Sequence, residues 1–429
     1  MSDDRIITVK ARRVWDSRAR PTVEAEVTLA GGASGRAIAP AGASTGSGEA
    51  LDRRDGGDRL QGYDVQDALA SIRDEIAVAL TGLSASSQAR VDQTLIDLDG
   101  TSQKRRLGGN ALIAVSLAVL QAAANAAGLP LWRYLLDART PVIPLPEIQI
   151  FGGGMHAGRR IALQDVMVVC PAASSFADAL EWTAEIYHAA GALMKRSGRL
   201  HGVADEGGFW PDFESNEAML EAAVAAIRCA GFEPGEDVGL SLDVAASAFG
   251  RGGAYSPSPG KPSMGSGEWS DTVEHWLSNF PIFAIEDPLA EDDATGFARF
   301  CARNGEGRHI IGDDLLVTDT ARIVEAAHDK LVNAALIKPN QVGTVTETKQ
   351  ALDAAHTAGF AAIVSARSGE TEDVAVAHLA VGWGAELLKV GSIARGERTA
   401  KWNEIIRIEE ELGAQARFAG WRALRCKSW

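Results

Sequence analysis

The chain has 429 residues, of which 46% are hydrophobic and 23% are charged, and its net charge is −15 at pH 7. These proportions are typical of a folded globular protein, and the length exceeds what one ordinary domain needs. The excess of negative charge argues against nucleic acid or an anionic membrane surface as a partner.

The four cysteines are far apart and form no CxxC pair. We therefore expect free thiols in a reducing compartment, not disulfides or a metal site. The first residues, MSDDRIITVK, lack the apolar stretch of a secretory leader, and no run of 18 apolar residues follows them. These features predict a cytoplasmic protein that does not enter a membrane.

The chain begins with a pattern of short strands. Apolar residues alternate along 22–29, which predicts a strand with one buried face, and a Gly-Gly turn leads to a partner strand at 34–39. The segment 40–50, PAGASTGSGEA, has little to pack and predicts a loop. Helical patterns follow at 66–82, 87–97 and 109–127.

The proline-rich segment TPVIPLP at 140–146 indicates a domain boundary. We therefore predict an N-terminal α+β capping domain over 1–138 and a larger domain over 139–429. In the larger domain, helical patterns are expected at 176–198 and 216–231, and a mobile loop is expected at 255–270.

The larger domain repeats one pattern six times: a short apolar run and then a polar residue able to do chemistry. Neighbouring runs are mostly about 20 to 30 residues apart, as strand, loop and helix require, and their apolar residues do not alternate. Such runs are typical of parallel strands buried on both faces, and their spacing favours a (β/α)8-type barrel. The polar residues are Asp243, Glu286, Asp313, Lys338, Arg367 with Ser368, and Lys389.

A barrel gathers the carboxyl ends of its strands around one opening, where barrel active sites lie. Asp243, Glu286 and Asp313 would meet there, and carboxylates are the ligands that Mg²⁺ prefers. Each acid could instead cap a helix or pair with an arginine. Three acids from consecutive units, with lysines after later strands, favour a metal site with a base beside it.

Twelve stretches in order along the chain resemble the enolase family. The resemblance runs from about Arg5 to the C-terminus. The stretches are DSRARPTVE (16–24), GASTGSGEA (42–50), LDGT (98–101), GGGMHAG (152–158), DEGGF (205–209), LDVAAS (242–247), IEDPL (285–289), GDDL (312–315), IKPNQVGTVTET (337–348), SARSGETED (365–373), LKVGS (388–392) and RIEEEL (407–412).

The resemblance implies the reaction of the family, in which 2-phosphoglycerate loses water to give phosphoenolpyruvate with two Mg²⁺ ions. Asp243, Glu286 and Asp313 match the ligands of the first ion, and Lys338 matches the base, as in the enolase superfamily. Nearby cations would lower the pKa of such a lysine toward use. Glu206 matches the residue that assists departure of the hydroxyl.

The resemblance also assigns the remaining site residues. Lys389 is expected to contact the substrate carboxylate, and Arg367 and Ser368 are expected to bind the phosphate. Ser44 is expected to bind the second metal. Gly42, Ala43 and Gln164 match substrate-contacting positions, and His156 and Asp165 fall at catalytic ones. His156 alone would be read as a surface loop histidine.

Several positions depart from the family pattern. Where this chain has Ala366, Asp165 and Gly152, the family usually has His, Glu and Asn. In the first loop Ala41 and Gly48 replace the family's Ser and His, and in the second loop Arg159 and Arg160 add positive charge.

Three hypotheses remain open. The protein is an enolase; or it is a paralogue performing related enolate or transfer chemistry, as carboxyphosphonoenolpyruvate synthases do in phosphonate natural-product pathways; or it is a non-catalytic binding protein. The resemblance further implies a homo-oligomer, either a dimer or an octamer, acting on a small phosphorylated carboxylic acid.

Overall fold

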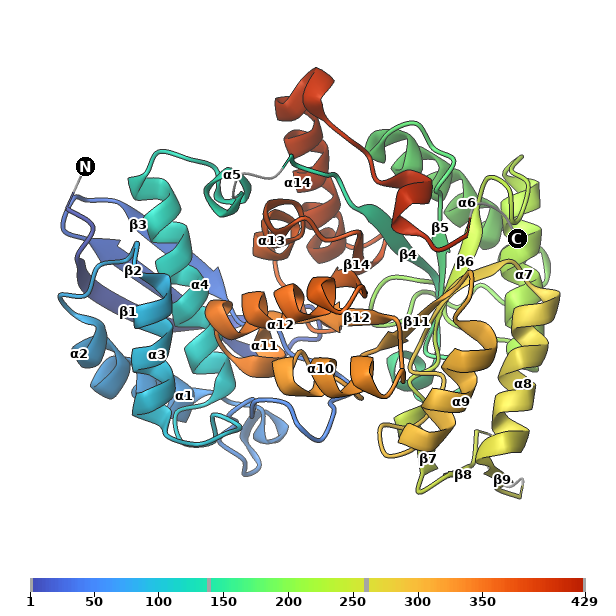
Figure 1. Ribbon diagram of the computed structural model, residues 1–429, viewed down its shortest axis with the longest axis horizontal. Helices are drawn as coiled ribbons and strands as arrows, with labels where there is room; N and C mark the ends of the chain where they lie inside the picture. Colours follow the sequence, from blue (N-terminus) through green and yellow to red (C-terminus); the bar gives the residue numbers. More distant parts are fainter. Residues whose placement is uncertain (1–2, 137–139, 258–261, 427–429) are drawn as a thin grey trace.

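The computed structural model describes residues 3–136, 140–257 and 262–426. A small sheet with helices on it forms the N-terminal part, and a closed barrel surrounded by helices forms the rest (Figure 1). The predicted boundary between residues 138 and 139 lies outside the described residues.

The N-terminal sheet is an antiparallel meander of β1 (Ile6–Trp15), β2 (Pro21–Leu29) and β3 (Ser34–Ile38). The predicted pair of strands at 22–29 and 34–39 is thus present, and β1 adds a strand that was not singled out. The helices α1 (Gln66–Ser71), α2 (Ala77–Leu80) and α4 (Gly109–Ala126) pack on this sheet. Helix α3 (Gln88–Asp99) packs on α4, and α5 (Leu131–Leu135) packs on α4 and on the barrel helix α13 (Ala375–Trp383). The helix predicted at 66–82 is divided, because a π-helical turn, Ile72–Ile76, separates α1 from α2.

Helix α4 is apolar on nearly all sides. By length and composition alone it could cross a membrane, but 83% of its 18 residues are buried inside the fold. It packs against β2 and β3 and forms the core of the N-terminal domain. A helix that is hydrophobic all round is explained by such burial.

Eight strands close the barrel. Six of them are the predicted apolar runs, so the pattern of buried parallel strands is confirmed. The strands are β4 (Leu145–Gly152), β5 (Asp165–Val169), β6 (Gly239–Asp243), β10 (Ile282–Glu286), β11 (His309–Gly312), β12 (Ala334–Ile337), β13 (Ala361–Ser365) and β14 (Leu387–Ser392).

The barrel is not parallel throughout. Strand β5 runs antiparallel to both β4 and β6. The connection from β4 to β5 contains only the short 3₁₀ helix η3 (Gly154–Ala157) and no crossover helix, and a parallel pair would need a longer crossover. As a result, the β4–β5 loop lies at the same opening as the carboxyl ends of the other strands.

Most helices of the barrel begin at a polar capping residue. The side chains of Ser175, Ser215, Asp293, Asp319 and Thr344 each accept a hydrogen bond from a first-turn amide. The helices are α6 (Phe176–Arg196), α7 (Asn216–Cys229), α8 (Ser266–Asn279), α9 (Ala294–Asn304), α10 (Thr320–His328), α11 (Pro339–Val342), α12 (Val345–Thr357), α13 (Ala375–Trp383) and α14 (Gly396–Leu412).

The loop expected at 255–270 is only partly a loop. Short strands β7 (Gly250–Arg251), β8 (Ala254–Tyr255) and β9 (Met264–Gly265) pair there, and α8 already begins at Ser266. The Glu268 carboxylate accepts the amide of Gly265 and so helps to start that helix. Residues 258–261 of the expected loop lie outside the described residues.

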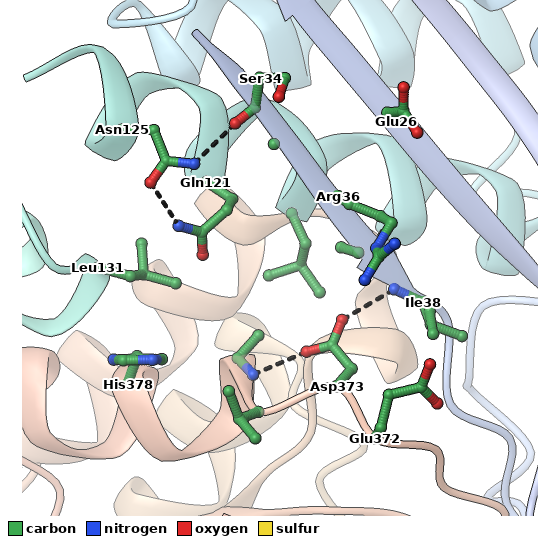
Figure 2. Close-up of a pocket in the computed structure, with 15 residues that line it drawn as sticks. Glu26, Ser34, Arg36, Ile38, Gln121, Asn125, Leu131, Glu372, Asp373 and His378 are labelled. Atoms are coloured by element: carbon green, nitrogen blue, oxygen red, sulfur yellow. Dashed lines mark hydrogen bonds between the residues drawn. The ribbon is translucent and has the colours of Figure 1, made fainter. Parts of the chain in front are cut away.

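The two domains meet along β3 and the start of α13. Asp373 is half-buried and accepts the backbone amides of Ile38, in β3, and Ala375, in α13, at 2.9 and 2.7 Å (Figure 2). A cavity of 540 Å³ lies beside this contact and is lined by both domains. Asp373 therefore joins the edge of the small sheet to the barrel.

Candidate active site

The carboxyl ends of the barrel strands bring the predicted residues together. Asp243 and Glu286 are the last residues of β6 and β10, and Asp313 and Lys338 directly follow β11 and β12. All four are at least nine-tenths buried. The predicted convergence of acids and lysines at one opening is therefore present.

One small cavity is lined by every predicted site residue except Glu286 and Asp313. These two acids lie behind it and contact the lining lysines. The cavity volume is 20 Å³, which is room for about one water molecule. The cavity in this structure is therefore too small for a phosphorylated acid.

The acids expected to bind metal are shared between two lysines. The Lys389 ammonium donates to Asp243 Oδ2 at 2.9 Å and to Glu286 Oε2 at 2.6 Å. Asp313 accepts from Lys338 Nζ at 2.5 Å and from the side-chain amide of Gln341 at 2.9 Å. Each acid thus already has a cationic neighbour.

Two carboxylate oxygens in this group remain unused. Asp243 Oδ1 and Glu286 Oε1 are buried, and neither has a hydrogen-bond partner among the described residues. A buried carboxylate oxygen without a partner is costly. Hard cations such as Mg²⁺ bind oxygen ligands of this kind, so the residues present fit a divalent metal.

A second acidic group lies next to the first. One ligand atom from each of Asp287, Asp313 and Asp314 lies within 4.8 Å of the others. The oxygens of Asp287 accept the amides of Asp313 and Asp314 at 3.0 and 2.8 Å, so this residue shapes the turn after β11. Burial, together with the charge of Asp313, raises the pKa of Asp314 to about 7. Asp313, which also contacts Lys338, belongs to both acidic groups.

The lysines are strongly affected by these acids. Burial alone would lower the pKa of Lys338, but the nearby Asp313 carboxylate outweighs burial and raises it. In the same way, Asp243 and Glu286 overcome the burial of Lys389 and raise its pKa well above the ordinary value. In the protein alone the pKa of Lys338 is therefore raised, not lowered. Bound cations would be needed to lower it.

Arg367 and Ser368, the predicted anion binders, follow β13. The Arg367 guanidinium donates to Glu49 at 2.9 Å and to the carbonyl of Ser44 at 3.0 Å. Ser368 Oγ accepts from Arg18 at 3.3 Å, which leaves its own proton free to donate. An incoming anion would thus compete with Glu49 for Arg367.

The first loop is fastened to the barrel. Ala41 and Gly369 exchange two backbone hydrogen bonds, and Arg18 donates to the Ala41 carbonyl at 2.8 Å. At Gly42 a Cβ atom would lie 2.0 Å from the Arg367 guanidinium, so a side chain there would displace the arginine. Gly42, Ala43 and Ser44 thereby lie beside Arg367 and Ser368 at the cavity.

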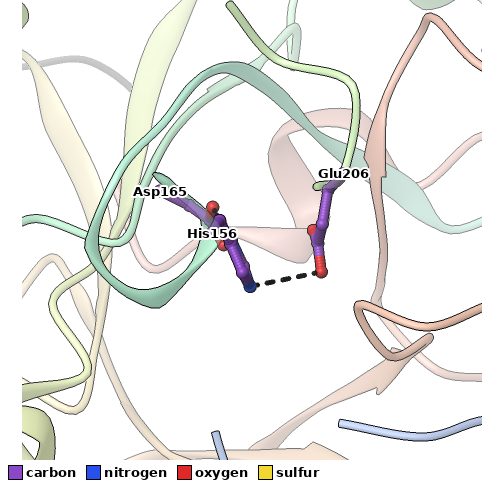
Figure 3. A group of neighbouring side chains, drawn as sticks. All are labelled: His156, Asp165 and Glu206. Atoms are coloured by element: carbon purple, nitrogen blue, oxygen red, sulfur yellow. Dashed lines mark hydrogen bonds and ion pairs between the residues drawn. The ribbon is translucent and has the colours of Figure 1, made fainter. Parts of the chain in front are cut away.

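Glu206 is directed into the cavity by a tight turn. Gly207 has φ +97°, and a Cβ atom there would lie 2.7 Å from the Ala394 carbonyl. Glycine is therefore required at this position. Beside Glu206 lies His156, which is buried and contacts Asp165 (Figure 3), so its reading as a surface loop histidine is wrong.

Sequence reasoning missed four polar residues that hold the site. Arg18, Glu49 and Gln341 lie inside quoted stretches but received no role. Gln149 is a polar residue in the middle of buried β4, and it is fully buried. A lone amide in an apolar strand was the available signal, because a buried amide needs partners.

The fold and the site together define a barrel with an N-terminal cap and a buried set of acids and lysines at its opening. Two family models match the chain. One, described as the enolase N-terminal domain, matches residues 6–135, and the other, the enolase C-terminal TIM barrel domain, matches residues 140–427. The chain belongs to the enolase family, and it is an enzyme of that family's lyase type.

Proposed function

We propose that the protein dehydrates 2-phosphoglycerate to phosphoenolpyruvate with two Mg²⁺ ions. The observation that carries this proposal is that two buried lysines contact three buried acids. Two carboxylate oxygens of these acids have no partner among the described residues. When bound, magnesium would supply positive charge that stabilises the substrate carboxylate as it becomes a dianion. Asp243, Glu286 and Asp313 would hold the first ion and Ser44 would join the second.

In this proposal Lys338 removes the C2 proton. Its ammonium contacts Asp313 at 2.5 Å, so neutralising that carboxylate would remove the attraction that keeps the lysine charged. Lys389 would bind the substrate carboxylate, while Arg367 and Ser368 would bind the phosphate. Gly42, Ala43 and Gln164 would complete the wall around the substrate.

Glu206 would assist departure of the C3 hydroxyl. It is buried and lines the cavity from the loop between α6 and α7, whereas Lys338 lines it from the end of β12. Two groups on different elements suit a reaction in which a proton is taken at one carbon and a hydroxyl leaves from the next. We further propose that the protein is a cytoplasmic homo-oligomer.

Exchanging Glu206 for glutamine should separate the two half-reactions. The C2 proton should still exchange with solvent, because Lys338 is intact, while phosphoenolpyruvate formation should fall by about 10²–10⁴-fold. Both can be followed with 2-phosphoglycerate and Mg²⁺ by proton NMR and by the absorbance of the product. Loss of exchange together with dehydration would contradict the assigned role of Glu206.

A second function is favoured by Ala366, which is buried where the family usually has histidine. A paralogue would form the same enolate and use it in related or transfer chemistry, as in phosphonate natural-product biosynthesis. The same assay distinguishes the two functions. Wild-type protein that exchanges the C2 proton without releasing phosphoenolpyruvate would support the paralogue, and rapid release would support the dehydratase.

A further inference from the structure

A fully buried arginine lies behind the predicted anion binders. Arg398 belongs to the first turn of α14, and none of its side chain is exposed. Its guanidinium contacts the loop that follows β13, which carries Arg367 and Ser368. A buried charge is costly unless other groups compensate it, so each contact of this side chain has to be accounted for.

The Arg398 guanidinium donates its hydrogen bonds to backbone carbonyl oxygens. Nη1 donates to the carbonyls of Arg367 and Val390 at 2.7 and 2.8 Å, and Nη2 donates to the carbonyl of Ser368. Two of the three carbonyls belong to the predicted phosphate binders, and the third follows Lys389 in β14. One side chain therefore fixes the carboxyl ends of two neighbouring strands relative to each other.

The positive charge of Arg398 is only partly compensated. Its ion pair with Glu397 is long, with 3.5 Å between Nε and Oε1, and the same oxygen already accepts from Arg395 at 2.9 Å. Nε has no hydrogen-bond partner among the residues that the structure describes. Carbonyl dipoles stabilise a guanidinium but do not remove its charge, so a positive potential remains behind the anion site.

A second buried cation of α14 is compensated differently. The ammonium of Lys401 is fully buried and contacts Glu370 Oε2 at 3.0 Å and the Thr371 carbonyl at 2.9 Å. Glu370 in turn accepts the backbone amide of Arg367 at 3.0 Å. Lys401 thus fastens the same loop, but a buried acid neutralises its charge. The more weakly paired Arg398 has charge left to act on a bound anion.

The neighbouring strand leaves room for Arg398. Gly391 has φ +116°, and a Cβ atom there would lie 3.1 Å from Arg398 Cδ and 3.1 Å from the Cβ of Glu206. A side chain at this position would be strained and would press on both residues. The glycine therefore lets the arginine reach the carbonyls behind the cavity.

The contacts of Arg398 also affect the donors that face an anion. The Arg367 carbonyl and the Ser368 amide belong to one peptide group. A hydrogen bond to the carbonyl polarises the amide of the same group and strengthens it as a donor. Because Arg398 is charged, we expect this effect to be larger than with a neutral donor.

We propose that Arg398 is a positioning residue of the anion site. It fixes the backbone of Arg367 and Ser368, and it places a buried positive charge behind a phosphate group bound there. Arg398 is not among the described residues that line the cavity, so it acts through these two residues and not by touching the substrate. The inference rests on the proposed role of Arg367 and Ser368 in phosphate binding.

Binding of inorganic phosphate to the full-length protein with Mg²⁺ tests the inference without any reaction. Arg398→Met removes the charge and should weaken phosphate binding by about 10–100-fold in a calorimetric titration. Arg398→Lys keeps the charge but not the fork of donors, so its loss should be smaller. Arg303→Met is the control, because Arg303 forms a surface pair with Glu274 at 2.7 Å, and its binding should be unchanged. Equal binding by wild type and Arg398→Met, or equal losses in the two Arg398 variants, would overturn the proposal.

A variant of the neighbouring acid separates the effect of charge from that of packing. The Glu397 side chain reaches the surface, so Glu397→Gln should fold even where variants of Arg398 do not. Its loss leaves Arg398 less compensated, and phosphate binding should become tighter by about 3–10-fold. If Arg398 only supported the fold, this variant would bind phosphate as well as wild type or less well. Either of these results would overturn the proposal.

Kinetics with 2-phosphoglycerate separate this inference from the proposed function. In Arg398→Lys the KM should rise in step with the loss of phosphate affinity, while kcat should stay within about threefold of wild type. If wild type converts the substrate but all variants bind phosphate equally, the role of Arg398 is wrong and the proposed function stands. If phosphate binding follows the expected order but wild type catalyses neither C2 exchange nor dehydration, the proposed function fails and the role of Arg398 stands. Wild type that binds no phosphate would overturn the inference.

Discussion

Exchange of the C2 proton of 2-phosphoglycerate into D₂O should be lost when Lys338 is replaced by alanine. A positioned base contributes about 10²–10⁴-fold to the rate, so the exchange rate should fall by at least about 10²-fold. The reason is geometric: Lys338 is the buried lysine that follows β12 and lines the cavity, and its ammonium is held by Asp313 at 2.5 Å.

Lys349→Ala is the matched control for this prediction. Lys349 pairs with Asp353 on the surface of α12, so its loss should leave exchange unchanged. Melting curves of both variants with Mg²⁺ will show whether they fold. A folded Lys338→Ala protein that exchanges the C2 proton at the wild-type rate would mean that another residue is the base.

Removal of divalent metal should lower the melting temperature and stop the reaction. A ligand present at 100 times its Kd stabilises the folded state by about 2.7 kcal/mol. The oxygens of Asp243 and Glu286 that have no partner among the described residues would supply this binding energy. Thermal melts in excess EDTA, and after Mg²⁺ is returned, measure this effect. Equal melts under both conditions would contradict the assignment of Asp243, Glu286 and Asp313 as ligands.

A single substitution tests the same site more locally. Glu286→Gln should reduce the stabilisation by Mg²⁺ because the amide has lost one charge, whereas Glu325→Gln, on the exposed face of α10, should retain it. If Glu286→Gln and wild type gain the same stability from Mg²⁺, then Glu286 is not a ligand.

The barrel could be predicted because its strands are buried on both faces. Runs such as GLSLD and IFAIE are apolar without alternation, and their polar final residues, Asp243 and Glu286, lie at the opening. The reversed direction of β5 could not be read in the same way. Its five residues are as buried as those of a parallel strand. Only the absence of a helix between β4 and β5 indicates that β5 runs in the opposite direction.

The candidate site was predicted from polar residues at strand ends, and that rule has a limit. It located Lys338 and Lys389 but not Gln149, which lies inside a strand and acts through its neighbours. It also gave no sign that His156 is buried, because a histidine in a glycine-rich loop has no apolar pattern around it. The contact with Asp165 depends on how η3 folds against β5, and no local sequence signal encodes that approach.

The most direct measurement of the central claim is a proton NMR experiment on the wild-type protein with 2-phosphoglycerate in D₂O, with and without Mg²⁺. We expect the C2 proton signal to disappear and the vinyl signals of phosphoenolpyruvate to appear, both only when Mg²⁺ is present. A folded protein that changes neither signal with Mg²⁺ would contradict the account.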